Sequence, residues 1–464
     1  MRKLFFSALL ACTVFQIFYA QSNIVGSWSG VLKIQQVQLP IVFNIQLQDN
    51  KLSATLDSPS QKAFGIKCDN VVFENNQLII SVNKLNAEYK GTLENDTIKG
   101  TFTQGIAIPL NLTKSTTVQA EPKRPQEPKP PFPYYTEEVK FINKTTGDTL
   151  AGTLTLPNKN AKCPIAILIS GSGAQDRNEE LLGHKPFLVI ADYLARNGIG
   201  TLRYDDRGVG ESKGNFQSAT TFDFSTDAEA ALGYLTTRKN VDVKHIGFIG
   251  HSEGGIIAPM VAARNSNVAF CVLLAGTGIR GDKLLLRQTN DISKAMETPD
   301  SIRMSEDQTN RKAFDIILNT KDIEKQKSEL AALIRENVQK MAQDAAPEEV
   351  EKRQAAILQQ LTSPWFQYFV KYDPAPTLSK VKCRVLALNG ERDLQVSPKE
   401  NLTAIRKALE AGGNKNFRIV ELSGLNHLFQ ECQTGVPSEY GSIEQTFSPK
   451  ALETIAKWIK ENKI

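Results

Sequence analysis

The sequence is poor in the residues that bind metals or form disulfides. Of its 464 residues only six are cysteine and four are histidine. Cys12 lies near the N-terminus, and the other cysteines are widely spaced, at Cys68, Cys163, Cys271, Cys383 and Cys432. No CxxC pair and no His/Cys cluster with metal-ligand spacing occurs. We therefore expect these cysteines to act as small apolar side chains, and we expect no metal site.

A large excess of positive charge is also missing. The chain has 55 Lys and Arg against 50 Asp and Glu, a formal net charge of +5, and Arg2 and Lys3 supply part of it. The densest basic stretch, residues 123–129, is interrupted by Glu127. Binding to a phosphate backbone needs clustered basic side chains. We therefore expect no nucleic-acid partner.

Long apolar runs are absent except at the N-terminus. Arg2-Lys3 precedes a nearly continuous apolar run, residues 4–19, which is followed by Ala20-Gln21-Ser22. This order is typical of a secretory signal peptide, so residues 1–20 predict export to the periplasm or out of the cell. The alternative is a lipoprotein anchored through Cys12, but the apolar run continues beyond that cysteine. No other stretch approaches the roughly 20 apolar residues of a spanning helix, so we expect no stable membrane insertion.

Residues 21–115 predict a small all-β domain. Apolar and polar residues alternate in short runs, which turn signals such as Asn75-Asn76 and Asn95-Asp96 separate. Asn and Asp tolerate the positive φ of tight hairpins, so a small barrel or sandwich is expected. We interpret Trp28 as a core residue; the alternative is a barrel that binds a ligand. Six prolines then predict an extended linker over residues 116–137.

From residue 138 to residue 464 the pattern is that of an α/β domain. Short apolar runs alternate with amphipathic helical patterns, which is typical of a mostly parallel sheet flanked by helices. The predicted strands are Ile165–Ile169, Ile199–Tyr204, Ile246–Gly250, Ala269–Ala275, Arg384–Asn389 and Phe417–Leu422. The predicted helices are 186–197, 223–238, 253–265, 398–411 and 448–462. Residues 279–370 carry helical spacing without strand patterns, so we expect a helical cap insertion there.

The strongest chemical signal is the segment Gly250–Gly254, which reads Gly-His-Ser-Glu-Gly. It follows a predicted strand and precedes a predicted helix, which is the setting of a Gly-x-Ser-x-Gly nucleophile elbow. A serine on so sharp a turn has a strained backbone, and the positions two away must lack side chains that would collide. Ser252 is therefore the predicted nucleophile.

A serine hydroxyl needs a base to remove its proton, and the four histidines allow an identification by elimination. His251 adjoins the serine and is expected to point elsewhere, His245 begins the strand before the elbow, and His184 precedes the nucleophile in the chain. His427 alone follows the last predicted strand, where the order of serine, acid and histidine requires the base.

The supporting acid should end a strand between Ser252 and His427. Asp393 follows the strand that ends at Asn389 and fits best, while Glu391 is the competing carboxylate. Its role would be to fix the imidazole tautomer and stabilise the imidazolium. Two backbone amides should bind the developing oxyanion: that of Glu253, directly after the nucleophile, and that of Ser172, preferred over Gly173, in the loop after the strand 165–169.

Several motifs carry a family resemblance. They are Gly171-Ser172-Gly173, Asp176-Arg177, Lys185-Pro186-Phe187 and the run from Arg203 to Gly208. With them the chain resembles the bacterial carboxylesterases of the EstD type, which belong with the serine aminopeptidases among the α/β hydrolases. The resemblance covers about residues 138–464. It implies an α/β-hydrolase fold and hydrolysis of carboxylic esters with short acyl chains, without a cofactor. Ser170 departs from the family, because many relatives have histidine there.

Together these features predict an exported serine hydrolase that acts on small-molecule esters through an acyl-enzyme. A serine peptidase or aminopeptidase with the same triad is one alternative. The other is a binding module, in which residues 21–115 hold a glycan or lipid and the hydrolase domain serves as support. The acyl group, the alcohol and the oligomeric state stay open.

Overall fold

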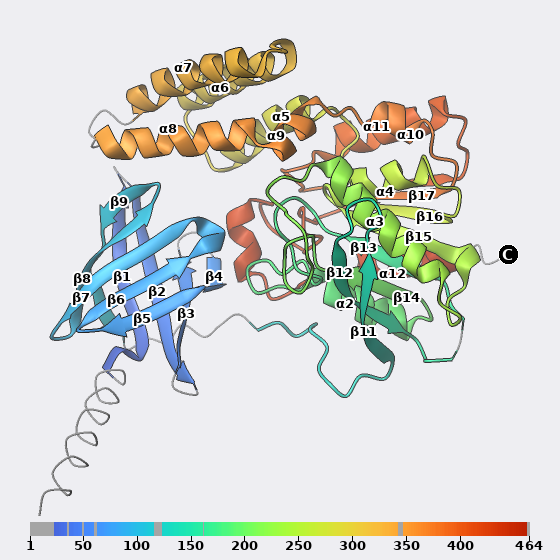
Figure 1. The fold of residues 1–464 in the computed structure, drawn as a ribbon, viewed down its shortest axis with the longest axis horizontal. Helices are drawn as coiled ribbons and strands as arrows, with labels where there is room; N and C mark the ends of the chain where they lie inside the picture. The colour runs from blue at the N-terminus through green and yellow to red at the C-terminus, as the bar shows by residue number, and fades with distance from the viewer. Residues whose placement is uncertain are drawn as a thin grey trace, which may run out of the picture. The chain divides into compact units, whose positions relative to one another are not determined.

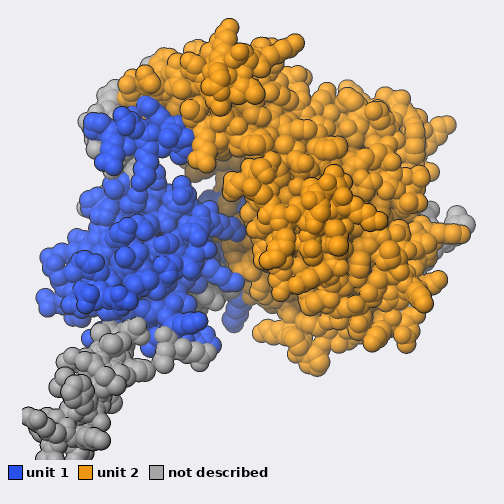
Figure 2. Space-filling view, in the orientation of Figure 1, with its two compact units in different colours: residues 1–123, 342–356, 438–442 blue, residues 124–341, 357–437, 443–464 orange. Residues whose placement is uncertain are grey.

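The computed structural model describes residues 23–34, 37–48, 51–59, 63–115, 123–160, 162–341 and 347–461. The predicted signal peptide, Cys12 and residues 116–122 of the predicted linker lie outside these residues. The chain divides into two compact units, one formed by residues 1–123, 342–356 and 438–442, and the other by residues 124–341, 357–437 and 443–464 (Figure 2). Each unit has its own sheet.

The first sheet is antiparallel throughout and follows the order β4-β3-β2-β1-β10-β8-β7-β6-β5, with β9 paired to β8. Its strands are β1 (Gly26–Ile34), β2 (Val37–Gln48), β3 (Lys51–Ser58), β4 (Ala63–Lys67), β5 (Asn70–Glu74), β6 (Gln77–Val82), β7 (Ala87–Glu94), β8 (Thr97–Gln104), β9 (Ile106–Pro109) and β10 (Leu112–Ser115). A short 3₁₀ helix, η2 (Asn83–Leu85), joins β6 to β7. In the described residues the path from β4 to β5 does not close, so the sheet is a half-barrel.

Alternation and asparagine turns account for this sheet. The β5–β6 and β7–β8 hairpins turn at Asn75-Asn76 and Asn95-Asp96, and Asn75, Asn76 and Asn95 have φ of 51°, 62° and 55°. These are two of the turns predicted from the sequence, and asparagine tolerates their left-handed backbone; a third predicted turn, Asp49-Asn50, lies outside the described residues. One face packs into a single apolar core around Phe43, Leu78 and Tyr89. Trp28 is 1% exposed in this core, as expected of a core tryptophan.

The second sheet has the order β11-β12-β14-β13-β15-β16-β17-β18. Pairings of β11 with β12 and of β12 with β14 are antiparallel, and the remaining pairings are parallel. The strands are β11 (Tyr135–Ile142), β12 (Thr149–Leu156), β13 (Ile165–Ile169), β14 (Gly200–Tyr204), β15 (Ile246–His251), β16 (Phe270–Leu274), β17 (Arg384–Gly390) and β18 (Phe417–Leu422). The carboxyl ends of the parallel strands therefore meet at one edge, where sites form in such sheets.

Helices cover both faces of this sheet (Figure 1). The flanking helices are α2 (Pro186–Arg196), α3 (Thr221–Thr236), α4 (Gly254–Ala262), α11 (Pro398–Ala411) and α12 (Pro449–Lys460), and short 3₁₀ helices are η3 (Val243–His245) and η4 (Pro437–Ser442). Side chains of α3, α4 and α11 share one apolar core with Ile165 and Ile167, whereas those of α2 and α12 share another with Ala166 and Leu168. Alternate residues of β13 thus point to opposite faces, which explains why its strand reads as continuously apolar.

The chain between β16 and β17 folds into helices, over the stretch where a helical cap is predicted. They are α5 (Gly281–Ala295), α6 (Asp300–Asn319), α7 (Ile323–Met341), α8 (Pro347–Thr362) and α9 (Pro364–Lys371), followed by the short α10 (Ala375–Leu378). An apolar cluster joins this cap to α4, with Ile256 and Met260 from α4, Leu284 from α5 and Phe369 from α9. None of the helices described in the structure is both long and apolar enough to cross a membrane.

Candidate active site

Ser252 lies on a sharp turn between β15 and α4. Its φ of 51° is left-handed, a conformation that a non-glycine residue adopts at a cost. Its amide donates to the Leu274 carbonyl at 2.8 Å, which ties the turn to β16. A Cβ at Gly250 would lie 2.0 Å from the Gly254 carbonyl oxygen, and one at Gly254 would lie 2.2 Å from that of Ile169. Both glycines are therefore required by close backbone contacts, as the elbow motif predicts.

Asp393 and His427 are joined by a direct hydrogen bond. The His427 Nδ1 and Asp393 Oδ2 atoms are 2.8 Å apart, and both side chains are buried. The other carboxylate oxygen, Oδ1, accepts from the amides of Gln395 and Val396 at 2.8 Å each. Asp393 follows β17 and His427 follows β18, so neighbouring parallel strands deliver the two side chains to the same edge. This leaves Nε2 as the ring nitrogen of His427 that is not engaged by Asp393.

Glu391, the competing acid, binds elsewhere. Its Oε2 accepts from the Ser423 hydroxyl at 2.6 Å and from the Gly424 amide at 2.9 Å, and the side chain is exposed. These two bonds also hold the pKa of Glu391 below its usual range. Its oxygens thus hold the turn after β18, not the imidazole of His427.

Ser252 reaches the same edge, half-buried, at the end of β15. Its neighbour His251 contacts the His427 segment directly: His251 Nε2 lies 3.0 Å from the His427 carbonyl oxygen, and the two rings are 4.9 Å apart between centroids. Among the described residues, no hydrogen bond joins the Ser252 hydroxyl to His427 itself. In enzymes without substrate this bond is often long and tightens only in the complex.

The loop after β13 packs against the elbow. A Cβ at Gly171 would lie 3.3 Å from the Ser252 Cβ atom, so the loop backbone approaches the serine closely. The Gly171 amide is already used, because it donates to Glu179 Oε1 at 2.7 Å. Within the described part of the chain, the amides of Ser172 and Glu253 have no hydrogen-bond acceptor. These are the two amides that the sequence analysis selects for binding an oxyanion.

Buried acids hold this loop in place. Asp206, after β14, accepts from the Ser170 hydroxyl and from the Gln175 amide, each at 2.9 Å. Burial raises the pKa of Asp206 well above its usual value. Next to it, Asp205 accepts from the Arg177 guanidinium at 2.7 Å. The sequence gives one sign of these buried acceptors, because two successive aspartates follow an apolar strand.

The Glu253 side chain connects the elbow to the cap. Its Oε1 atom accepts from the Thr221 hydroxyl at 2.7 Å and from the Trp365 Nε1–H at 2.8 Å, and Ser172 also contributes a side-chain hydrogen bond. Thr221 begins α3 and Trp365 belongs to α9. Burial raises the pKa of Glu253, although these hydrogen bonds act to lower it. A single carboxyl group thus contacts the oxyanion loop, a flanking helix and the cap.

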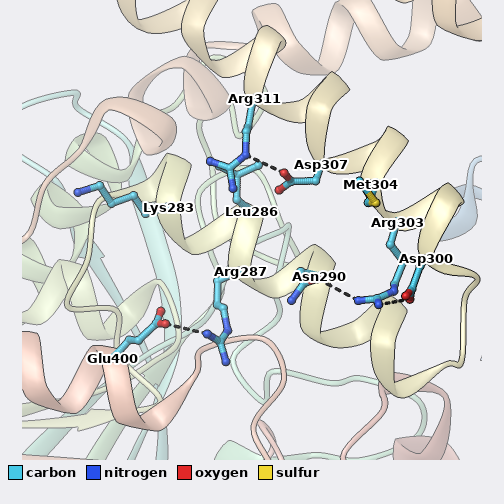
Figure 3. A pocket seen from close by; sticks show the side chains of 10 residues that line it. All are labelled: Lys283, Leu286, Arg287, Asn290, Asp300, Arg303, Met304, Asp307, Arg311 and Glu400. Atoms are coloured by element: carbon cyan, nitrogen blue, oxygen red, sulfur yellow. Dashed lines mark hydrogen bonds and ion pairs between the residues drawn. The ribbon is translucent and has the colours of Figure 1, made fainter.

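Figure 3 shows a pocket lined by side chains of α5, α6 and α11. Its volume is about 500 Å³. Its charges are largely compensated, since Arg287 pairs with Glu400 at 2.8 Å and Arg311 with Asp307 at 2.7 Å. None of the predicted site residues lines it. The lining residues are Lys283, Leu286, Arg287, Asn290, Asp300, Arg303, Met304, Asp307, Arg311 and Glu400. Across the described ranges, no group of three His, Cys, Asp or Glu side chains is arranged to hold a metal ion.

Several known proteins are similar in sequence to this chain. The family model of the serine aminopeptidases, S33, matches residues 185–431, more than half of the chain. Esterase EstD of Thermotoga maritima is 24% identical over 336 residues, which cover 71% of this chain and 70% of that protein. The putative hydrolase YtaP of Bacillus subtilis is 29% identical over 126 residues, 24% of this chain and 42% of that one.

Among solved structures, the esterase PF2001 of Pyrococcus furiosus covers 71% of this chain and 91% of its own, with a TM-score of 0.44 and 14% identity. The match of the family model to more than half of the chain shows that it belongs to the serine aminopeptidase S33 family, and it is a serine-type hydrolase whose α/β-hydrolase fold follows an all-β half-barrel in the sequence.

Proposed function

We propose that this chain hydrolyses carboxylic esters with Ser252 as nucleophile, His427 as general base and Asp393 as its supporting acid. The observation that carries the proposal is the hydrogen bond between His427 Nδ1 and Asp393 Oδ2, at the strand edge where Ser252 occupies a left-handed elbow. A carboxylate on Nδ1 fixes the tautomer in which Nε2 is the basic nitrogen. That nitrogen is the one able to take the serine proton.

The reaction then runs in two halves. Ser252 Oγ attacks the ester carbonyl carbon while His427 Nε2 takes its proton, and the carbonyl oxygen becomes an oxyanion bound by the amides of Ser172 and Glu253. The tetrahedral intermediate collapses, and the alcohol leaves with the proton from His427. Water then attacks the acyl carbon and loses a proton to His427. The bond to Ser252 Oγ breaks as His427 returns that proton to Oγ, and the carboxylic acid leaves.

The surroundings favour an ester with a small apolar acyl group. An apolar cluster of Ile256, Met260 and Phe369 lies along α4 directly after the elbow, beneath the cap. A cluster of this kind suits a hydrocarbon chain, because burial of apolar surface drives its binding. The acyl length and the alcohol are set by cap side chains, and the resemblance to EstD-type esterases implies short acyl chains.

An aminopeptidase with the same triad would need a carboxylate available to the ammonium group of its substrate. Glu253, beside the nucleophile, is buried, and its Oε1 atom already accepts from Thr221 and Trp365. Its raised pKa further reduces its value as a cation ligand. We therefore expect nitrophenyl esters to be turned over at least tenfold faster than aminoacyl-nitroanilides, and the reverse preference would favour the peptidase.

The decisive variant is Ser252→Ala. We expect it to lower kcat for p-nitrophenyl acetate by on the order of 10⁴, because the chain would lose its nucleophile. Ser305→Ala, an exposed serine on α6, is the matched control and should keep full activity. Unchanged hydrolysis by Ser252→Ala, with circular dichroism equal to the native protein, would remove Ser252 from the mechanism.

A further inference from the structure

The residue before the nucleophile, His251, is engaged in a way that the reaction above does not use. His251 is 6% exposed, and its partner Glu179 is 5% exposed. The His251 Nδ1 atom lies 2.9 Å from Glu179 Oε1. The sequence predicts that His251 points away from Ser252. In the structure its ring lies between two of the loops that form the site.

Both ring nitrogens of His251 face hydrogen-bond acceptors. Nδ1 faces the Glu179 carboxylate, and Nε2 faces the main-chain carbonyl oxygen of His427 at 3.0 Å. A neutral imidazole carries one N–H and one lone pair, so in that form one of these contacts would set two lone pairs against each other. Only the imidazolium donates to both. Opposite an ionised Glu179, this geometry therefore favours the doubly protonated ring.

Glu179 extends the connection to the oxyanion loop. The same Oε1 atom that faces His251 accepts the Gly171 amide at 2.7 Å. Glu179 adopts a left-handed backbone with φ of 53°, a strained conformation for a residue with a side chain. A Cβ at Gly171 would lie 3.3 Å from Glu179 Oε1 and 3.5 Å from His251 Nδ1. The loop, the carboxylate and the imidazole thus fit together only because residue 171 lacks a side chain.

We propose that His251 remains an imidazolium at neutral pH and that its ion pair with Glu179 positions the active site, holding the oxyanion loop after β13 and the His427 loop after β18 against the nucleophile elbow. Neither residue exchanges a proton with substrate; both are positioning residues. The proposal rests on the proposed function, since its kinetic consequence follows only if Ser252, His427 and the Ser172 amide carry the reaction.

The charges around His251 agree with this protonation state. Burial alone would lower its pKa, but the charge and hydrogen bond of Glu179, the His427 carbonyl and the charge of Asp393 together raise it above its usual value. The titratable groups that face the ring are therefore Glu179, Asp393 and His427. Since the folded pKa lies above the unfolded one, the stability that protonation of His251 contributes is fully present just below the unfolded histidine pKa of about 6.5 and is lost as the pH rises through the folded pKa. We expect the two loops to be held less firmly as the pH rises above the folded pKa of His251.

The protonation state can be measured without any catalysis. With ¹⁵N-histidine labelling, the chain has only four imidazoles to resolve, and the signals lost in His251→Gln identify residue 251. We expect both ring nitrogens of His251 to show imidazolium shifts at pH 7.5. In Glu179→Gln, whose amide oxygen can still accept both hydrogen bonds, the titration should move down by about 1 to 3 pH units, the effect of removing an opposite charge at contact distance. A neutral His251 at pH 7 in the native protein would overturn the proposal.

Kinetics test the positioning role. We expect His251→Gln to lower kcat by about 10- to 100-fold, the usual result of misplacing reacting groups by about 1 Å, with KM changed less than threefold. In Glu179→Gln the alkaline limb of the kcat profile should move to lower pH together with the His251 titration. His245→Gln is the control, because His245 pairs with Asp242 at 2.7 Å at the opposite end of β15 and should leave kcat and its pH profile unchanged. An unshifted alkaline limb in Glu179→Gln would show that the pair has no part in positioning.

The two levels of inference fail separately. If Ser252→Ala keeps its activity, the proposed chemistry is wrong, whereas the ¹⁵N titration of His251 still decides the ion pair. If Ser252→Ala is inactive and His251 titrates as neutral, the triad stands and the positioning pair is wrong. Glu179→Gln in an otherwise native chain keeps the kinetic test available even if His251→Gln fails to fold.

Discussion

The two sheets of this chain bury different kinds of side chain. In the described strands of the half-barrel, Asp57 is the buried charged residue, and the core is otherwise built from side chains such as Trp28, Phe43 and Tyr89. The carboxyl edge of the second sheet instead buries many ionisable groups. They are Glu179, Asp205, Asp206, His251, Glu253, Asp393 and His427. Burying a charge is costly unless it is paired, so a fold accumulates such groups where they have a use.

This difference teaches where the chemistry of the chain lies. The half-barrel is held by apolar packing and by backbone ladders. At the edge of the second sheet, carboxylates bind donors from other segments of the chain, as Glu179 does with Gly171 and His251. The ionisable groups that could act on a substrate are therefore concentrated at this edge. Substitutions in the two regions should therefore affect different observables.

The largest effect should come from Asp393→Asn. The substitution keeps the shape of the side chain but favours the wrong tautomer of His427, so we expect kcat to fall by on the order of 10³ to 10⁴. Glu391→Gln is the matched control, because its carboxylate holds Ser423 and Gly424 and is exposed. Ester hydrolysis at pH 8 measures both. A large loss in Glu391→Gln with little change in Asp393→Asn would exchange the roles of the two acids.

The sequence predicts the framework of this edge well. Strand 165–169 agrees with β13, the others agree within one residue at either end, and helix 398–411 agrees with α11. The larger differences lie at helix ends: α4 ends at residue 262 and not at 265, and α3 begins at residue 221 and not at 223, because Thr220 and Asp223 form a capping box. Periodicity detects the apolar face of a helix but places its first turn poorly, since that turn depends on one or two polar side chains.

The supporting residues of the site could not be predicted in the same way. Glu179 and His251 are 72 positions apart, and their contact depends on how a loop without periodicity folds back on the elbow. Elimination selects His427 because chain order is a strong constraint, and it sets His251 aside because that residue adjoins the serine. Tertiary packing, and not the sequence motif, decides where the side chain of a histidine next to the nucleophile points. The sequence contains Glu179, Gly171 and His251 but no pattern that predicts their contact.

In the half-barrel, Trp28→Ala should cost stability and leave the chemistry untouched. Trp28 is buried, its Nε1–H donates to the Ile24 carbonyl at 2.7 Å, and Lys114 lies over its ring. Loss of a core tryptophan costs about 3–5 kcal/mol through lost burial and the remaining cavity. Urea unfolding, with hydrogen exchange of the β1–β2 amides as the readout, measures the loss of stability. Trp28→Phe is the milder control. A parallel tenfold loss of kcat in the folded variant would contradict the separation between the two regions.

The smallest effect should come from Glu253→Gln, which tests whether the buried edge favours a neutral group. The amide oxygen can still accept from Thr221 and Trp365, so we expect stability to change by no more than about 1 kcal/mol.

The sign of this change in stability depends on pH. Burial raises the pKa of Glu253, so the native protein has its full contribution from this group at low pH and loses it as the pH rises through that value. The variant carries no such loss, and its stability relative to the native protein should therefore increase from pH 4 to pH 7 in denaturant titrations. Glu253→Leu, which removes both acceptors, is the control that should be destabilised at every pH. A Glu253→Gln protein that becomes relatively weaker as the pH rises would mean that the ionised carboxylate is the favoured form, and the edge of the second sheet would then stabilise one more buried charge.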